Sequence, residues 1–267
     1  MYKLKVKTIV CSSIGKKRKV NQDNFYANRC MNSKFKPYIL HSFLKIKREK
    51  TYAICDGMGG EKHGEIASMV TVRLIERYLK KYPYIFEKFD KHLECLVDNA
   101  NRAICKLIKE NDNERMGSTL ALLCIAPERE SAIVANIGDT KVLLFRDGKL
   151  ERISEDHNQA QSLVNMGMIT EEEARVHKEK SKLTQHLGIF PEELILEPFV
   201  SDYIDIKKGD CFIICSDGLT DMLSYDEILS IISKKELKTK KKAKELVSSA
   251  NSKGGNDNIT IIICEVI

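Results

Sequence analysis

The sequence has no run of eighteen or more apolar residues, which argues against a transmembrane helix. The first thirteen residues alternate polar and apolar side chains as a strand does, and they lack the charged-then-apolar layout of a signal peptide. Both absences favour a cytoplasmic protein without a membrane partner.

No CxxC pair occurs among the nine cysteines. Most of them lie inside apolar runs, and Cys211 and Cys215 fall on one expected strand, too far apart to bridge within it. We therefore expect buried free thiols in a reducing compartment, rather than a disulfide or a zinc site.

Internal repeats, Pro/Ser-rich linkers and low-complexity tracts are also missing, so we expect one compact domain over residues 1–267. The formal charge of +6 is concentrated in two basic stretches, 34–50 and 234–245. For the second stretch we prefer a solvated helix face, with a polyanion-binding patch as the alternative. No aromatic stacking platform accompanies the lysines, so we expect no nucleic-acid partner. For the first stretch we expect a surface hairpin.

Apolar periodicity separates blocks of strands from blocks of helices. Helices are expected over 66–78 and 93–108, and two shorter ones near Tyr225 and Lys240. Strands are expected at 4–12, 51–55, 118–125, 131–137, 141–145, 148–153, 193–201, 211–216 and 258–267. Asp147-Gly148 predicts a tight hairpin. This order predicts an α+β layered domain with largely antiparallel sheets.

Aspartates stand at the ends of five apolar runs, usually with a glycine beside them: Asp23, Asp56, Asp139, Asp217 and Asp257. Because the strand ends of one sheet converge, these side chains could face one another. Each one alone could be an ordinary Asp-Gly turn. Five together favour a shared site.

Carboxylates gathered in this way repel one another and lose hydration, unless a hard divalent cation binds between them. Glycines beside the aspartates let backbone carbonyls approach such an ion, and Gly57 is the best candidate. Histidine and cysteine do not accompany the acids, so magnesium or manganese fits better than zinc.

Seven features occur in order between Arg18 and Asp257: RKVNQD, YAICDGMGGEKHGEIAS, GSTLALL, ANIGDTKV, a polar helical stretch, FIICSDGLTD and GGNDNIT. With them the chain resembles the metal-dependent serine/threonine protein phosphatases of type 2C, especially the compact bacterial members. We accordingly expect a four-layer αββα sandwich of two mainly antiparallel sheets flanked by helices, with a small helical lid at about 158–190.

The resemblance assigns metal ligands. In the family, the aspartate of the DGMGG element, here Asp56, bridges two metal ions, and its neighbour, here Gly57, contributes a carbonyl. Asp217 and Asp257 would complete the shell of the first ion, and Asp23 would be an additional ligand that acts partly through other groups.

It also assigns a third ion and a phosphate contact. A weaker third ion would use Asp139 together with Asp217. The family's phosphate-binding arginine stands five residues before Asp23, and Arg18 occupies that position.

Several positions depart from the family or support its site. Gln22 replaces a common glutamate, which should alter a water-mediated contact to the second metal, and Asn258 would support the loop that bears Asp257. Met58 stands where eukaryotic members carry a histidine. Thr140-Lys141 replaces a common Ser-Arg pair, with little expected effect.

The implied activity is hydrolysis of phosphoserine and phosphothreonine in proteins by a hydroxide that bridges two Mn²⁺ or Mg²⁺ ions about 3.5–4 Å apart. We expect a monomer that opposes a serine/threonine kinase. The alternative is a pseudophosphatase that binds phosphoproteins without turnover, which the loss of a metal aspartate would mark.

The remaining candidates receive structural interpretations. We expect His157 to orient a loop, His63 and His186 to lie at the surface or to pack, and Met166 and Met168 to pack within the lid.

Overall fold

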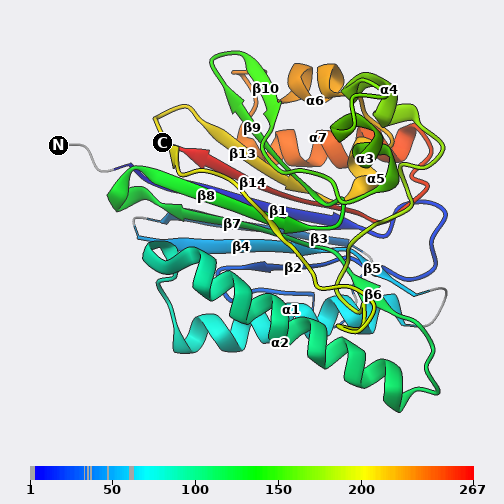
Figure 1. The fold of residues 1–267 in the computed structure, drawn as a ribbon. Helices are drawn as coiled ribbons and strands as arrows, with labels where there is room; N and C mark the ends of the chain where they lie inside the picture. Colours follow the sequence, from blue (N-terminus) through cyan, green and yellow to red (C-terminus); the bar gives the residue numbers. More distant parts are fainter. Residues whose placement is uncertain (1–3, 33, 35, 37, 47, 60–62) are drawn as a thin grey trace.

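The computed structural model describes residues 4–32, 34, 36, 38–46, 48–59 and 63–267, and it has four layers (Figure 1). Two antiparallel sheets lie face to face in the middle, and helices cover both outer faces. The predicted α+β sandwich is therefore confirmed.

The first sheet runs in the order β10 (Lys149–Arg152), β9 (Lys141–Arg146), β13 (Cys211–Cys215), β14 (Ile259–Val266), β1 (Val6–Ser13), β3 (Tyr38–Ile46). The second runs β11 (Phe199–Val200), β8 (Ser131–Ile137), β7 (Leu120–Ala126), β4 (Lys50–Cys55), β2 (Asn24–Ala27), and β12 (Ile204–Asp205) pairs with β8. A short ladder joins β5 (Gly57–Met58) to β6 (Gly117–Ser118). All strand pairs among the described residues are antiparallel.

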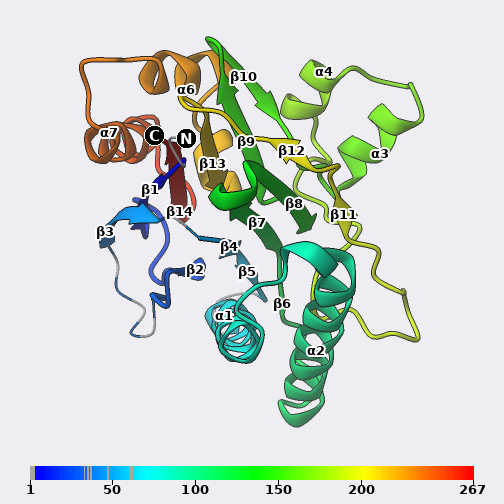
Figure 2. The ribbon, with the colours of Figure 1, turned by 90° about the vertical axis from the view of Figure 1, so that its left-hand side faces the viewer.

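Helices α1 (Gly64–Lys81) and α2 (Phe89–Glu110) cover the second sheet. Helices α5 (Asp217–Thr220), α6 (Tyr225–Ile232) and α7 (Thr239–Ser252) cover the first. Helices α3 (Gln159–Asn165) and α4 (Glu171–Val176) stand to one side of the sandwich (Figure 2). Short 3-10 turns lie at Phe86–Lys88 and Pro127–Arg129.

The long apolar run of β14 is explained by burial on both faces. Ile262 and Cys264 point between the two sheets, whereas Ile261 and Ile263 pack against α5–α7. This alternation follows the two-residue period of a strand. The strand is thus fixed between two cores, and so is the position of its first residue.

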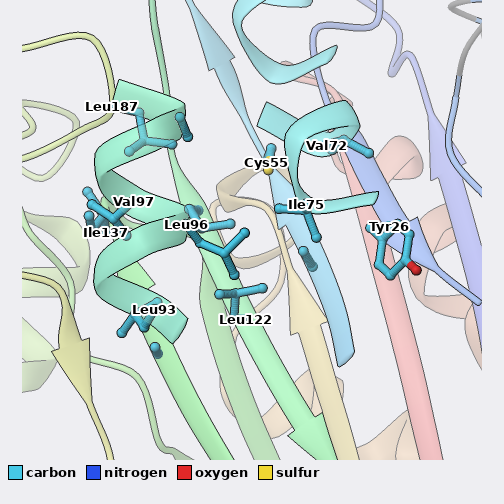
Figure 3. Packing of buried hydrophobic residues seen from close by; sticks show 14 of the residues in the cluster. Tyr26, Cys55, Val72, Ile75, Leu93, Leu96, Val97, Leu122, Ile137 and Leu187 are labelled. Atoms are coloured by element: carbon cyan, nitrogen blue, oxygen red, sulfur yellow. The ribbon is translucent and has the colours of Figure 1, made fainter. Parts of the chain in front are cut away.

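On the other side, α1 and α2 present aliphatic stripes to the second sheet (Figure 3). Leu93, Leu96 and Val97 of α2 come together with Leu122 of β7 and Ile137 of β8. The helical periodicity read from the sequence is therefore a core-facing stripe, and this packing fixes where β4, β7 and β8 end.

The predicted hairpin at Asp147-Gly148 is confirmed, since both residues have positive φ (51° and 80°) between β9 and β10, as a primed turn requires.

Three other expectations are wrong. The run 193–201 forms only the two-residue strand β11, and Ile195 is exposed. The basic stretch 34–50 is no hairpin: β3 pairs with β1 at a sheet edge, and β4 belongs to the other sheet. Residues 35, 37 and 47 of that stretch lie outside the described residues.

The third concerns the lid methionines. Met166 and Met168 are 71% and 68% exposed, so they do not pack within the α3–α4 segment. The helices themselves fall inside the expected lid range, whose boundaries stay a prediction. In the described part of the chain, no helix combines the length and apolarity needed to span a bilayer.

Candidate metal and phosphate site

The antiparallel register brings the strand-end aspartates to one edge of the sandwich. Because Asn24 of β2 pairs with Cys55 of β4, Asp23 and Asp56 come at matching positions just beyond that pair. Asp217 follows β13 and Asp257 precedes its neighbour β14, so these two also share a strand edge. Asp139 follows β8.

These positions surround a cleft of about 660 Å³. Its lining contains eight of the residues singled out in the sequence: Arg18, Gln22, Asp56, Gly57, Met58, Asp139, Asp217 and Asp257. Asp23 and Asn258 are buried and do not line the cleft. Ser181 and Leu183 contribute a wall from the segment that follows α4.

Burial and mutual repulsion raise the pKa of four acids, Asp23, Asp56, Asp139 and Asp217. Burial and then the charges of Asp23 and Asp217 hold the pKa of Asp56 well above its ordinary value. Burial is the largest cause at Asp23 too, and raises its pKa to about 7 despite the hydroxyl bond from Ser216. The pKa of Asp139 rises to about 6, because burial raises it more than the charge of Lys141 lowers it. The pKa of Asp217 is raised by burial and by Asp139.

Two carboxylate oxygens in this group lack any partner. Asp23 Oδ1 and Asp217 Oδ1 are both buried without a hydrogen bond. Unpaired buried acceptors with raised pKa values are what a hard cation would satisfy, and an all-oxygen donor set suits Mg²⁺ or Mn²⁺. No three His, Cys, Asp or Glu side chains within the described ranges form a ready coordination cluster, so the carboxylates would have to turn toward a shared ion.

The backbone at Gly57 is fixed by close packing. A Cβ at this position would lie 2.0 Å from the carbonyl oxygen of Gly64 and 2.8 Å from that of Gln22. The amide of Gly57 donates to the Gln22 carbonyl at 3.2 Å. A glycine is therefore required for the chain to pass here beside Asp56.

Arg18 reaches the acids from the rim. Its Nη2 donates to Asp257 Oδ2 at 2.5 Å, and that hydrogen bond raises the pKa of the guanidinium. The Arg18 side chain is 49% exposed, so it has room to turn toward a ligand in the cleft.

Asn258 joins the loops that carry Arg18 and Asp257. Its Oδ1 accepts from the amide of Gln22 at 2.7 Å, and its Nδ2 donates to the carbonyls of Ile14 and Val20 at 2.9 and 3.0 Å. These bonds fix the loop before β2 against the start of β14.

Sequence reasoning missed two hydroxyl residues. Ser216 Oγ donates to Asp23 Oδ2 at 2.7 Å and so links the two sheets beneath the cleft. Thr119 Oγ1 accepts from the amide of Asp56 at 2.9 Å and lies 2.6 Å from Thr140 Oγ1. The available signal was their position within the SDG and GST motifs.

Sequence reasoning also did not foresee the contacts of Lys141, which it considered only as part of the Thr140-Lys141 replacement. Its Nζ donates to the backbone carbonyl of Asp139 at 2.9 Å and pairs with Asp156 Oδ2 at 2.9 Å. A lysine opening an apolar strand was the available signal. His157, expected to orient a loop, accepts from the amide of Gly138 at 3.1 Å, which bears out that interpretation.

Comparisons with known proteins agree with this geometry. A family model described as protein phosphatase 2C matches residues 41–252. The chain is 31% identical to protein phosphatase PhpP of Streptococcus pneumoniae, with 94% of each covered. Its fold is similar to a serine/threonine phosphatase of S. agalactiae, with a TM-score of 0.80, 28% identity and coverage of 98% of this chain and 100% of the other. It is also similar to the catalytic domain of the phosphatase PstP in complex with two manganese ions, with a TM-score of 0.77, 27% identity and 99% of each covered.

Proposed function

Because this chain belongs to the protein phosphatase 2C family, we propose that it hydrolyses phosphoserine and phosphothreonine in proteins with the help of two Mn²⁺ or Mg²⁺ ions. One observation carries the proposal: four carboxylates, one of them paired with Arg18, converge with that arginine on one cleft. The acids fit divalent cations, and the arginine fits the phosphate of a substrate.

In this proposal Asp56, the Gly57 carbonyl, Asp217 and Asp257 hold the two ions, and Asp23 supports them from below. Asp139 joins Asp217 at a weaker third position. When bound, such ions polarise a water and lower its pKa toward neutrality, which supplies the nucleophile. The similarity to the PstP catalytic domain in complex with two manganese ions supports a site for two ions.

The chain's own groups position the reactants. Arg18 can present two donors to phosphate oxygens, a geometry that favours charge in the transition state. Thr119 and Ser216 hold Asp56 and Asp23 in place through one hydrogen bond each. Gln22, packed against Gly57, would reach the second ion through a water.

The wider setting is also part of the proposal. We place the protein in the cytoplasm as a monomer of one domain, acting on phosphorylated proteins against a serine/threonine kinase. The absence of disulfides supports the compartment, since all nine cysteines are free. Residues 158–190 would act as a lid, because Ser181 and Leu183 form one wall of the cleft.

Turnover of a phosphothreonine peptide tests the activity. Wild type should hydrolyse the peptide when Mn²⁺ or Mg²⁺ is titrated in and should stop when a chelator is added. Asp217→Asn should lower the rate by about 100-fold or more. Asp226→Asn, the same change at an exposed position of α6, is the matched control and should keep the wild-type rate.

A folded wild-type protein that shows no turnover with any divalent cation would overturn the proposal that the protein is an active phosphatase. That outcome would favour a phosphoprotein-binding module.

A further inference from the structure

A network of charged side chains lies directly behind Asp139. Asp156 is its centre: Oδ2 is 2.9 Å from Lys141 Nζ and 3.4 Å from Arg152 Nη1. The side chains of Lys141 and Asp156 are only 12% and 8% exposed. Burial lowers the pKa of Lys141, but the charges of Asp156 and Asp139 outweigh it, so the lysine stays protonated. These charges are therefore paired with each other inside the protein.

One end of this network reaches the α3–α4 segment. Arg152 Nη2 donates to both carboxylate oxygens of Glu171 on α4, at 2.7 and 2.9 Å, and to Gln161 Oε1 on α3 at 2.8 Å. The buried residues of the two helices are only Ala160, Gln161 and Ala174. The segment has little apolar surface against the body, so polar contacts attach it, and Arg152 is one of them beside the stacking of Arg175 on Tyr225.

The other end reaches the loop that carries Asp139. Lys141 Nζ donates to the Asp139 carbonyl at 2.9 Å. Gly138 in the same loop exchanges hydrogen bonds with His157: its carbonyl accepts from the His157 amide at 2.9 Å, and its amide donates to the ring. The chain that leaves for α3 and the Asp139 loop are thus held to each other.

A small cavity of about 50 Å³ lies between the network and the cleft. The cavity and the cleft share three lining residues, Asp139, Asp217 and Ser181. Asp156 also lines this cavity, and its Oδ1 is buried without a hydrogen-bond partner. The carboxylate is therefore held through one oxygen only, by Lys141 and Arg152. A displacement of either Lys141 or Arg152 should therefore move Asp156, and the movement of Asp156 should displace the other cation.

We propose that Lys141, Arg152 and Asp156 are positioning residues that couple the placement of the α3–α4 segment to the orientation of the Asp139 loop. Disturbing Glu171 at the outer end then loosens residues 138–141 at the inner end, although Glu171 and Asp139 make no direct contact. Its consequence for catalysis rests on the proposed function, but the coupling itself does not.

Hydrogen–deuterium exchange of the metal-free protein tests the coupling. In Glu171→Gln, peptides from 159–176 and from 138–146 should both exchange faster, by about threefold to fivefold, which is the size of effect that an exposed ion pair supports. Glu172→Gln is the matched control and should leave both peptides unchanged. Glu172 is exposed on the same helix, and no described residue forms an ion pair with it.

Faster exchange confined to 159–176, or equal changes in both variants, would overturn the coupling. The metal requirement gives a second readout: the Mn²⁺ concentration for half-maximal rate should rise about threefold in Glu171→Gln and not in Glu172→Gln. An unchanged requirement would overturn the catalytic consequence. If wild type shows no turnover, the proposed function fails, whereas the exchange result still decides the coupling.

Discussion

Two buried groups of charges meet at Asp139 and are built in opposite ways. The strand-end cluster consists of Asp23, Asp56, Asp139, Asp217 and Asp257, with raised pKa values for the first four. The second group is the network of Lys141, Arg152, Asp156 and Glu171, in which each anion has a cation within 4 Å. The network carries its own counter-charges, whereas the cluster is short of them.

This difference indicates what each group is for. A paired network holds its side chains in fixed positions, and removing one partner leaves an unpaired charge in the low-dielectric interior. An unpaired cluster lowers the stability of the protein and persists where function needs it, here for cations from solution. Mutations should therefore change stability with opposite signs in the two groups.

The largest effect is expected from Lys141→Met, which removes the cation beside buried Asp139 and leaves buried Asp156 paired with Arg152 alone. The free energy of unfolding should fall by about 3–5 kcal/mol. Urea unfolding with a chelator present measures it, and Lys149→Met, at an exposed position on β10, is the matched control. A loss below about 1 kcal/mol would remove the distinction between the two groups.

The pH dependence of stability sharpens the comparison next. The folded state raises the pKa of Asp23 to about 7 and of Asp139 to about 6, so it holds protons that the unfolded chain releases near its ordinary pKa of 3.8. The contribution is complete below about pH 4 and is lost as the pH rises through 6 and 7. Unfolding of the metal-free protein should become easier over that range, by at most about 1.4 kcal/mol per pH unit for each proton.

Asp23→Asn provides the control for that profile. The variant should show a flatter dependence between pH 5 and pH 8, because the proton bound at Asp23 is gone. A wild-type stability that instead rises with pH over this interval would contradict the assignment of Asp23 as a protonated buried acid.

The smallest effect is expected at the exposed methionines. Met166→Ser with Met168→Ser should change the free energy of unfolding by no more than about 0.5 kcal/mol, because both side chains already face solvent. Thermal unfolding checks this. A clear loss of stability would mean that apolar contacts, rather than Arg152, attach the α3–α4 segment.

The sequence predicted the parts of this account that depend on local pattern. The alternation at the start of the chain predicted β1, and short apolar runs predicted β8 and β14. An aspartate at a strand end needs only that strand to be placed. The order of strands and helices also predicted that the sheets would be largely antiparallel. The family motifs supplied the residue roles, which no spacing could have assigned.

The rest depends on contacts between distant residues. Nothing local shows that Lys141 and Arg152 both meet Asp156, because Lys141 lies on another strand. Nor does it show that Glu171 reaches Arg152, since that contact forms only when α4 docks. The apolar run at 193–196 has no partner strand, so its pattern was misleading. The basic composition of 34–50 concealed a strand whose edge position tolerates lysines.

Thermal unfolding of wild type and Asp217→Asn, each with chelator and with Mn²⁺, tests most directly whether the strand-end cluster exists to hold cations. With chelator, Asp217→Asn should be more stable than wild type by about 1 kcal/mol, or about 2–4 °C in Tm, because one repelling buried carboxylate is gone. Mn²⁺ should raise the Tm of wild type and leave that of the variant nearly unchanged. A variant less stable than wild type in chelator, or one that Mn²⁺ stabilises equally, would contradict the account.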